Sequence, residues 1–150
     1  MDDFKIRTYT QADKAGLVGL LKLNIPHYFA ESQIEEFKNY LDNQVEEYFI
    51  IEKFDKLIGA GGINFNHYNQ EGRISWDLIN PNFQGKGAGK KLLDYRLNRL
   101  KSMDNIEKIT VRTTQMAYKF YEKNGFQLQN IMKNHWAKGF DLYRMKYKHI

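Results

Sequence analysis

Apolar residues that alternate with polar ones predict a series of short strands along the chain. Residues 4–9 alternate with period two, which is typical of a strand with one buried face. Two apolar runs, 48–54 and 57–65, flank the turn Asp55-Lys56 and predict a hairpin. Three glycines inside the second run indicate a β-bulge or a close backbone approach. Further strands are expected at 72–79, 108–112, 126–132 and 140–147, the last two joined by a loop around 136–139.

Apolar residues spaced three or four apart predict helices between these strands. The first helix follows Thr10, which with Asp13 has nearly the spacing of a capping box. The second begins at the full box formed by Ser32 and Glu35 and ends near residues 42–43. A third runs from a glycine-rich segment to about residue 103. The expected buried faces are Leu17, Val18, Leu20 and Leu21, then Ile34, Phe37 and Leu41, then Leu93, Leu97 and Leu100.

Composition narrows the class of protein. With 150 residues, 42% of them hydrophobic and 27% charged, the chain predicts one globular domain over residues 1–150. It has no cysteine, which excludes disulfides, thiolate metal sites and cysteine nucleophiles. The acidic start Met1-Asp2-Asp3 lacks the apolar segment of a signal peptide, and no apolar run reaches membrane-span length, so we expect a cytoplasmic protein without a membrane partner.

The net charge of +5 would attract a nucleic acid or a polyanionic cofactor. The lysines are spread along the chain, and no zinc-ligand or RNA-binding signature is present. We therefore expect neither a nucleic-acid partner nor a metal.

The glycine-rich segment Gln84-Gly85-Lys86-Gly87-Ala88-Gly89-Lys90 lies between a strand and a helix. Glycines at alternate positions let N–H groups converge at the helix N-terminus, which is a favourable site for a pyrophosphate. The segment fits neither the P-loop pattern nor the dinucleotide-binding pattern. It fits [Q/R]-x-x-G-x-[G/A] at Gln84, Gly87 and Gly89. A turn without any ligand is the alternative.

A second motif, Ala117-Tyr118-Lys119-Phe120-Tyr121-Glu122-Lys123-Asn124-Gly125-Phe126, follows a strand-like run. Gly125 is placed to end its helix in the left-handed conformation. Together the two motifs resemble the GNAT superfamily of N-acetyltransferases. The resemblance implies an α/β (α+β) fold with a mixed, mostly antiparallel sheet of about seven strands and about four helices on both faces. It also implies direct acetyl transfer from acetyl-CoA to a primary amine.

The resemblance assigns roles to residues of the cofactor site. The backbones of Leu78 and Ile79 would pair with the pantetheine arm and polarise the thioester carbonyl. Tyr121 would be the general acid, or a core aromatic. Thr114 stands where many members have Asn, and it would contact the cofactor or cap a helix. The other cofactor-binding residues implied are Gln84, Gly85, Lys86, Gly87, Ala88, Gly89, Lys90, Ala117 and Phe120.

The general base is less defined, because Arg73 stands where some members have Glu. Asp77 is the nearest carboxylate and Glu71 lies at the start of the strand, but a carboxylate here could instead pair with Arg73. A water chain without a dedicated base is equally open.

For the acceptor we expect an aromatic wall with one or two carboxylates, suited to a small cationic amine. Its residues would be Tyr28, Phe29, Trp76 and Trp136, unless these only pack the core. A noncatalytic acyl-CoA-binding domain, acetylation of a protein N-terminus or lysine, and a homodimer remain open alternatives.

Overall fold

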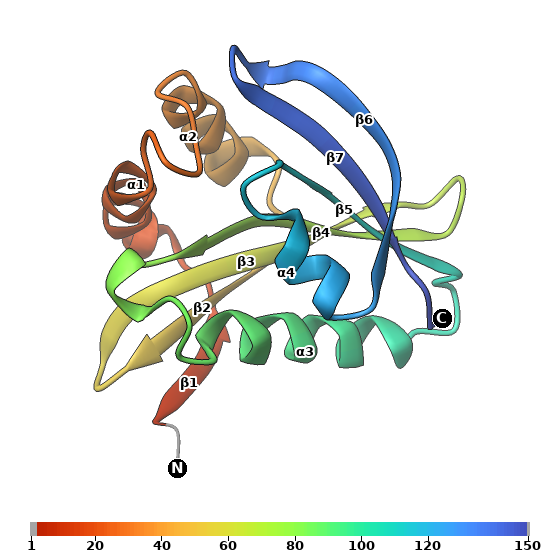
Figure 1. The fold of residues 1–150 in the computed structure, drawn as a ribbon. Coiled ribbons are helices and arrows are strands. Elements are labelled where there is room, and N and C mark those ends of the chain that lie inside the picture. The colour runs from red at the N-terminus through yellow and green to blue at the C-terminus, as the bar shows by residue number, and fades with distance from the viewer. Residues whose placement is uncertain (1–2, 150) are drawn as a thin grey trace.

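The computed structural model describes residues 3–149, which form one seven-stranded sheet with the strand order β1-β2-β3-β4-β5-β7-β6 (Figure 1). Only the β4–β5 pair is parallel; the other neighbours are antiparallel. This confirms the expected mixed, mostly antiparallel sheet. The strands are β1 (Phe4–Thr8), β2 (Glu47–Lys53), β3 (Lys56–Asn66), β4 (Glu71–Ile79), β5 (Lys108–Thr113), β6 (Phe126–Ala137) and β7 (Phe140–Tyr147).

Helices cover both faces of the sheet. The helices α1 (Lys14–Leu23) and α2 (Gln33–Asn43) share one apolar core with Tyr48 and Ile50 of β2. Helices α3 (Ala88–Lys101) and α4 (Tyr118–Lys123) lie on the other side, in a core that includes the alternate β2 residues Phe49 and Ile51. We call the two sides the α2 face and the α3 face. No helix within residues 3–149 is long and apolar enough to cross a membrane.

A bulge is expected within the glycine-containing strand β3, and the structure has one opposite these glycines, in strand β4. Two of its residues, Trp76 and Asp77, lie opposite the single residue Gly61. Trp76 has a φ of 49°, so the backbone turns at this point. As a result Ser75 and Trp76 both point to the α2 face, where each contacts Tyr40, and Asp77 turns to the α3 face.

The sheet is open at its centre. Strand β4 pairs with β5 only from Glu71 to Ile74, opposite Lys108 to Val111. Beyond Ile74 and Val111 the two strands diverge (Figure 1), and their facing backbone edges have no ladder partner among the described residues. This gap leads from the α3 face to the α2 face.

Two turns differ from their predicted positions. The first hairpin turns at Phe54 and Asp55, one residue earlier than expected, and both have a positive φ, of 51° and 61°. Such a pair matches the right-handed twist of the flanking strands. Strand β6 continues to Ala137, so the predicted loop around 136–139 is a two-residue turn.

The predicted capping box at Ser32 is wrong. Ser32 has the helical angles φ −59° and ψ −20° and makes no side-chain cap. Instead Gln33 Oε1 accepts a hydrogen bond of 3.0 Å from Ala30 N. Because the chain is already helical at Ser32, its hydroxyl cannot reach the N–H groups of the next turn.

The box at Thr10 is confirmed, and it is part of a larger ionic cluster. Thr10 N donates to Asp13 Oδ2 at 2.9 Å, ahead of α1. Arg7 of β1 donates to both Asp13 oxygens, at 2.9 and 2.8 Å, and also to Glu52. The Arg7 hydrogen bond is the main cause that lowers the pKa of Asp13 to about 2.

We expect Asp13→Asn to reduce the free energy of unfolding by about 1–2 kcal/mol at neutral pH. A carboxylate with a lowered folded-state pKa stabilises the protein above its unfolded pKa, and this contribution disappears as the pH falls from about 4 toward 2. Urea unfolding at several pH values should therefore show the two proteins converging in acid. The more exposed Asp42, which pairs with Lys14, provides the control Asp42→Asn, with a smaller loss. A difference that stays constant with pH would contradict this account.

Candidate active site

The glycine-rich segment forms an open loop before α3. Gly85 and Gly87 have φ values of 75° and 92°, and Gly87 is the N-cap of the helix. The first backbone hydrogen bond runs from Lys91 N to Gly87 O at 3.0 Å, so the N–H groups before Lys91 have no acceptor within the helix. A Cβ on Gly85 or Gly87 would meet nothing within 4 Å. The loop therefore presents N–H donors beside open space.

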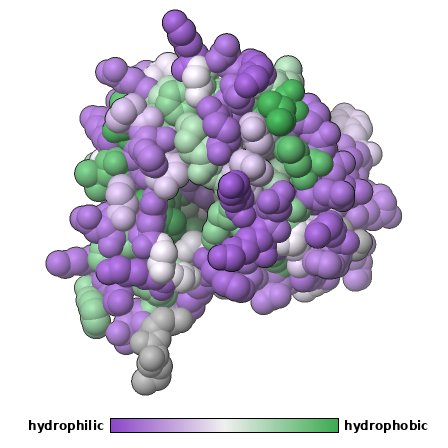
Figure 2. All heavy atoms as spheres, in the orientation of Figure 1, coloured by the Kyte–Doolittle hydropathy of each residue, from purple (hydrophilic) through white to green (hydrophobic). Residues whose placement is uncertain are grey.

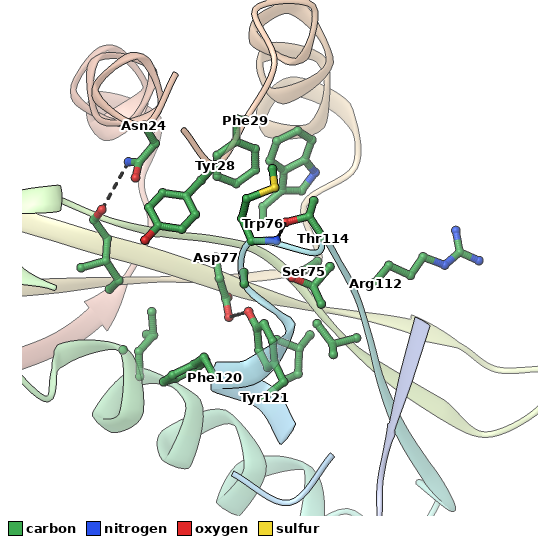
Figure 3. A pocket seen from close by; sticks show the side chains of 18 of the residues that line it. Asn24, Tyr28, Phe29, Ser75, Trp76, Asp77, Arg112, Thr114, Phe120 and Tyr121 are labelled. Carbon is green, nitrogen blue, oxygen red and sulfur yellow. Dashed lines mark hydrogen bonds between the residues drawn. The ribbon is translucent and has the colours of Figure 1, made fainter. Parts of the chain in front are cut away.

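A cleft of about 980 Å³ runs from this loop through the gap between β4 and β5. Figure 2 shows a hollow in this face with apolar surface inside it, surrounded by polar residues. Ile79 lines the cleft at the end of β4. Its backbone groups face away from β3, because the next residue, Asn80, donates its N–H to Ile58 O of β3 at 2.7 Å and the direction of the backbone groups alternates along an antiparallel ladder. Ile79 O accepts a hydrogen bond of 3.2 Å from Asn24 Nδ2 (Figure 3).

At the middle of the cleft one carboxylate joins three elements. Tyr121 Oη on α4 donates to Asp77 Oδ2 at 2.5 Å (Figure 3). Arg96 Nη1 on α3 donates to Asp77 Oδ1 at 2.5 Å and to Gly62 O at 3.1 Å. Arg96 is fully buried, and its Nη2 has no hydrogen-bond partner among the described residues. Both oxygens of Asp77 are thus occupied by donors.

This arrangement fixes the protonation of the tyrosine and the arginine. Burial, and then the charge and hydrogen bond of Asp77, raise the pKa of Tyr121 well above its usual value, so the phenol is protonated at neutral pH. Burial alone would lower the pKa of Arg96, but the charge and hydrogen bond of Asp77 outweigh it and the pKa is raised. The site therefore holds a neutral phenol and a charged guanidinium.

Aromatic residues from the α1–α2 connection cover the other end of the cleft (Figure 3). Phe29 stacks on Trp76 with ring centroids 6.0 Å apart. Tyr28 Oη donates to Gln84 Oε1 at 3.0 Å, which links this connection to the glycine loop. Trp136 Nε1 donates to Thr113 O at 3.2 Å at the end of β5. These contacts place the four expected acceptor residues in one cleft with the loop.

Among residues 3–149, the cleft is lined by one carboxylate and by several positively charged side chains. Asp77 is the only carboxylate among its lining residues, and it is occupied by Arg96 and Tyr121. Glu71, the other carboxylate considered, pairs with Arg73 at 3.6 Å and accepts a hydrogen bond from Thr110. The expected aromatic wall therefore contains one carboxylate, Asp77, and both of its oxygens already accept hydrogen bonds. The lining side chains that carry positive charge are Arg73, Lys90, Arg112 and Lys123.

The structure brings most of the sequence-predicted site residues together. Leu78 does not line the cleft, because its side chain lies in the core of the α2 face. Lys86 lies over the ring of Phe83, and Ala88 is buried under the loop. Thr114 lines the cleft and its Oγ1 accepts from Met116 N at 3.3 Å. The others that line it are Tyr28, Phe29, Trp76, Asp77, Ile79, Gln84, Gly85, Gly87, Gly89, Lys90, Ala117, Phe120, Tyr121 and Trp136.

Sequence reasoning missed Arg96 and Arg112. Arg96 occupies the apolar face of α3, three residues after Leu93, and an arginine at such a position is a signal for a buried ion pair. Arg112 carries no local signal, because its place in the cleft depends on where β4 and β5 diverge. Within residues 3–149, no group of three or more His, Cys, Asp or Glu side chains is placed to hold a metal ion.

The family model of the acetyltransferase (GNAT) domain matches residues 9–149. The chain belongs to the GNAT acetyltransferase family. Its members are N-acetyltransferases that use acetyl-CoA. This GNAT chain is 28% identical over 125 residues to an uncharacterized N-acetyltransferase ycf52-like protein of Prochlorococcus marinus. The aligned region covers 81% of this chain and 68% of the relative.

Solved structures share the fold at low sequence identity. Spermidine N-acetyltransferase from Vibrio cholerae, in complex with CoA and spermine, superposes with a TM-score of 0.73 at 22% identity, over 96% of this chain and 94% of that one. The ribosomal-protein-S18-alanine N-acetyltransferase from Escherichia coli gives a TM-score of 0.77 at 16% identity, over 96% and 92%. The acceptors named for these two enzymes are chemically different, so the shared fold does not determine the acceptor here.

We expect Gly61→Ala to be strongly destabilising, because its Cβ would lie 2.3 Å from Asp77 Oδ1 and 2.7 Å from Arg96 Nη1. Disturbing a buried ion pair costs about 2–4 kcal/mol of unfolding free energy. Gly19→Ala on α1 is the matched control, since its Cβ would meet nothing within 4 Å and alanine favours a helix. Denaturant unfolding of both variants measures the effect. Equal stability of the two would show that Asp77 and Arg96 are not held as closely as described.

Proposed function

We propose that this GNAT protein transfers the acetyl group of acetyl-CoA directly to a primary amine of a small molecule. The observation that carries the proposal is the continuous cleft, which joins the N–H groups of the glycine loop to Asp77 and Tyr121. Bound acetyl-CoA would supply an acetyl group activated as a thioester. The absence of cysteine from the chain leaves no cysteine relay, in keeping with direct transfer.

The residues of the cleft fit this cofactor. The N–H groups before Lys91 would hold the pyrophosphate, since a helix N-terminus favours a negative charge. The unpaired edges of β4 and β5 would hold the pantetheine arm by backbone hydrogen bonds. The Ile79 N–H, which faces away from β3, would polarise the thioester carbonyl.

Tyr121 would be the general acid. Its Oη carries a proton at neutral pH, because burial and Asp77 raise its pKa. In the structure this proton is donated to Asp77, so donation to the leaving sulfur requires rotation of the hydroxyl hydrogen. Asp77 would orient the phenol rather than act as a free base, since Arg96 and Tyr121 occupy both of its oxygens. The proton of the amine would then leave through water.

We expect Gly87→Ala to weaken CoA binding about tenfold or more, because a side chain at a φ of 92° is strained and would project beside the N–H donors. Gly89→Ala is the matched control: its Cβ would make an ordinary contact of 3.5 Å with Phe120. Its CoA affinity should stay within about threefold of the original protein. Isothermal titration calorimetry with CoA measures both. Equal affinities would remove the loop from the cofactor site.

We expect Tyr121→Phe to lower kcat about tenfold or more, with CoA affinity within about threefold, as the loss of a general acid would. Tyr118→Phe, in the same helix, is the matched control and should keep its kcat, because the Tyr118 ring packs on Tyr143 and the α3-face core and its hydroxyl makes no hydrogen bond within residues 3–149. Thiol release gives kcat, and urea unfolding of both variants separates a catalytic loss from a folding defect. Full turnover of a folded Tyr121→Phe protein would leave this phenol as packing.

A further inference from the structure

Two arginines lie side by side on the α2 face of the cleft. Arg73 of β4 is opposite Asn64 on one side and Thr110 on the other. Arg112 is two residues beyond Thr110 and therefore lies on the same face of β5. Ile74, which follows Arg73, and Val111, which precedes Arg112, point to the opposite face and lie in its core. Both arginines line the cleft.

The positive charge of these arginines is incompletely compensated. Arg73 Nε is buried without a hydrogen-bond partner within residues 3–149. Its ion-pair partner Glu71 is 3.6 Å away and also accepts hydrogen bonds from Asn69 and Thr110. Arg112 is exposed to solvent and makes no side-chain hydrogen bond or ion pair among the described residues, so its guanidinium is accessible to a ligand. A pair of guanidinium groups in this state favours an external anion.

A third arginine adds to the positive potential. Arg144 of β7 is directly opposite Arg112 across the β5–β7 pair, and it too has no side-chain partner among the described residues. Burial first, and then repulsion from Arg73 and Arg144, lower the pKa of Arg112. An anion bound between these groups would remove the repulsion.

Besides Glu71, the neighbouring groups are neutral and polar side chains and the carboxylate of Glu46, which accepts hydrogen bonds from Asn64 Nδ2 at 3.2 Å and from Phe65 N at 3.0 Å. Asn64 Oδ1 accepts hydrogen bonds from Tyr40 Oη at 2.9 Å and from Ser75 Oγ at 2.7 Å. Burial raises the pKa of Tyr40 to about 12, so its hydroxyl remains neutral. No free carboxylate lines this end to attract a second ammonium group. A polyamine would therefore face uncompensated like charges here.

We propose that the amine acetylated by this protein also carries an anionic group, a carboxylate or a phosphate, that binds Arg73 and Arg112. This specificity rests on the acetyl transfer proposed above. Figure 3 shows the Arg112 side chain extending away from Asp77 and Tyr121. The anion therefore binds at a distance from the reacting centre, and the acceptor spans the space between them.

Matched amines that differ only in the anion test the proposal. The first pair is δ-aminovalerate and its amide, and the second is aminopropyl phosphate and aminopropanol; spermidine is the polycation. Thiol release measures kcat/KM for each amine. We expect kcat/KM to be about tenfold or more higher for the anionic member of at least one pair, because a hydrogen bond between charged groups contributes enough binding energy for such a factor. Which pair shows the preference distinguishes carboxylate from phosphate.

Arg73→Gln and Arg112→Gln should each abolish this preference by raising the KM of the anionic amine about tenfold or more. The CoA affinity of both variants, measured by calorimetry, should stay within about threefold. Arg99→Gln is the matched control. It removes the same charge from the exposed side of α3, where Arg99 pairs with Glu47, and should keep the preference.

Equal use of both members of each pair, or a preference for spermidine, would overturn the anion site while leaving acetyl transfer intact. If no amine releases thiol, the proposed acetyl transfer fails for these amines, and binding decides the anion site. The CoA-saturated protein is then titrated by calorimetry with the N-acetylated forms of each pair. Tighter binding of the anionic forms, lost in the Arg73→Gln and Arg112→Gln variants, supports the proposal. Equal binding of anionic and neutral forms overturns it.

Discussion

The negative charge of Asp77 organises the centre of this protein. It is held by Arg96 from α3 and Tyr121 from α4, and Arg96 in turn donates to the backbone of β3. Removing one partner of such a buried pair typically costs about 3–5 kcal/mol, because the other charge is left uncompensated. The bulge at Trp76 directs Asp77 into this position, and Gly61 has no side chain that would exclude it. The geometry of the cleft follows from these contacts.

The parts of the structure that the sequence predicts well are determined locally. The glycine loop and the end of α4 at Gly125 depend on conformations that glycine adopts readily. The bulge at Trp76 lies beside Gly61, where a side chain would meet Asp77 and Arg96. Apolar periodicity predicted the strands and the buried helix faces, because it too is a property of neighbouring residues in the sequence. The box at Ser32 failed because its sequence matches, yet the backbone there is already helical.

The charges of the site could not be predicted in the same way. Asp77 was noted as a carboxylate near the reaction, but its two partners come from helices distant in the sequence. Arg73 drew attention as a missing glutamate and as a possible ion-pair partner, not as a ligand-binding residue. Its position next to Arg112 depends on the β4–β5 register and on the point where these strands diverge. Such juxtapositions are properties of the tertiary structure, and a single sequence without homologues contains no direct record of them.

Enzymes whose solved structures share this fold act on acceptors as different as spermidine and the alanine of a ribosomal protein. The proposed cofactor side of the cleft relies largely on backbone groups, which vary little with side-chain identity. The α2 face is built from side chains of β3, β4, β5 and the α1–α2 connection. Selection for a new acceptor can therefore act on that face without disturbing the loop.

The hydrogen bond between Tyr28 and Gln84 makes the two sides of the cleft thermodynamically dependent on each other. Gln84 belongs to the glycine loop, the proposed cofactor site, and Tyr28 to the connection that covers the proposed acceptor side. A ligand that favours the intact bond at one side favours the same conformation at the other, and a ligand that breaks it weakens both. By linkage, each ligand changes the affinity of the other by the same factor. In the proposed function, the phenol of Tyr28 thus sets part of the cooperativity between cofactor and acceptor.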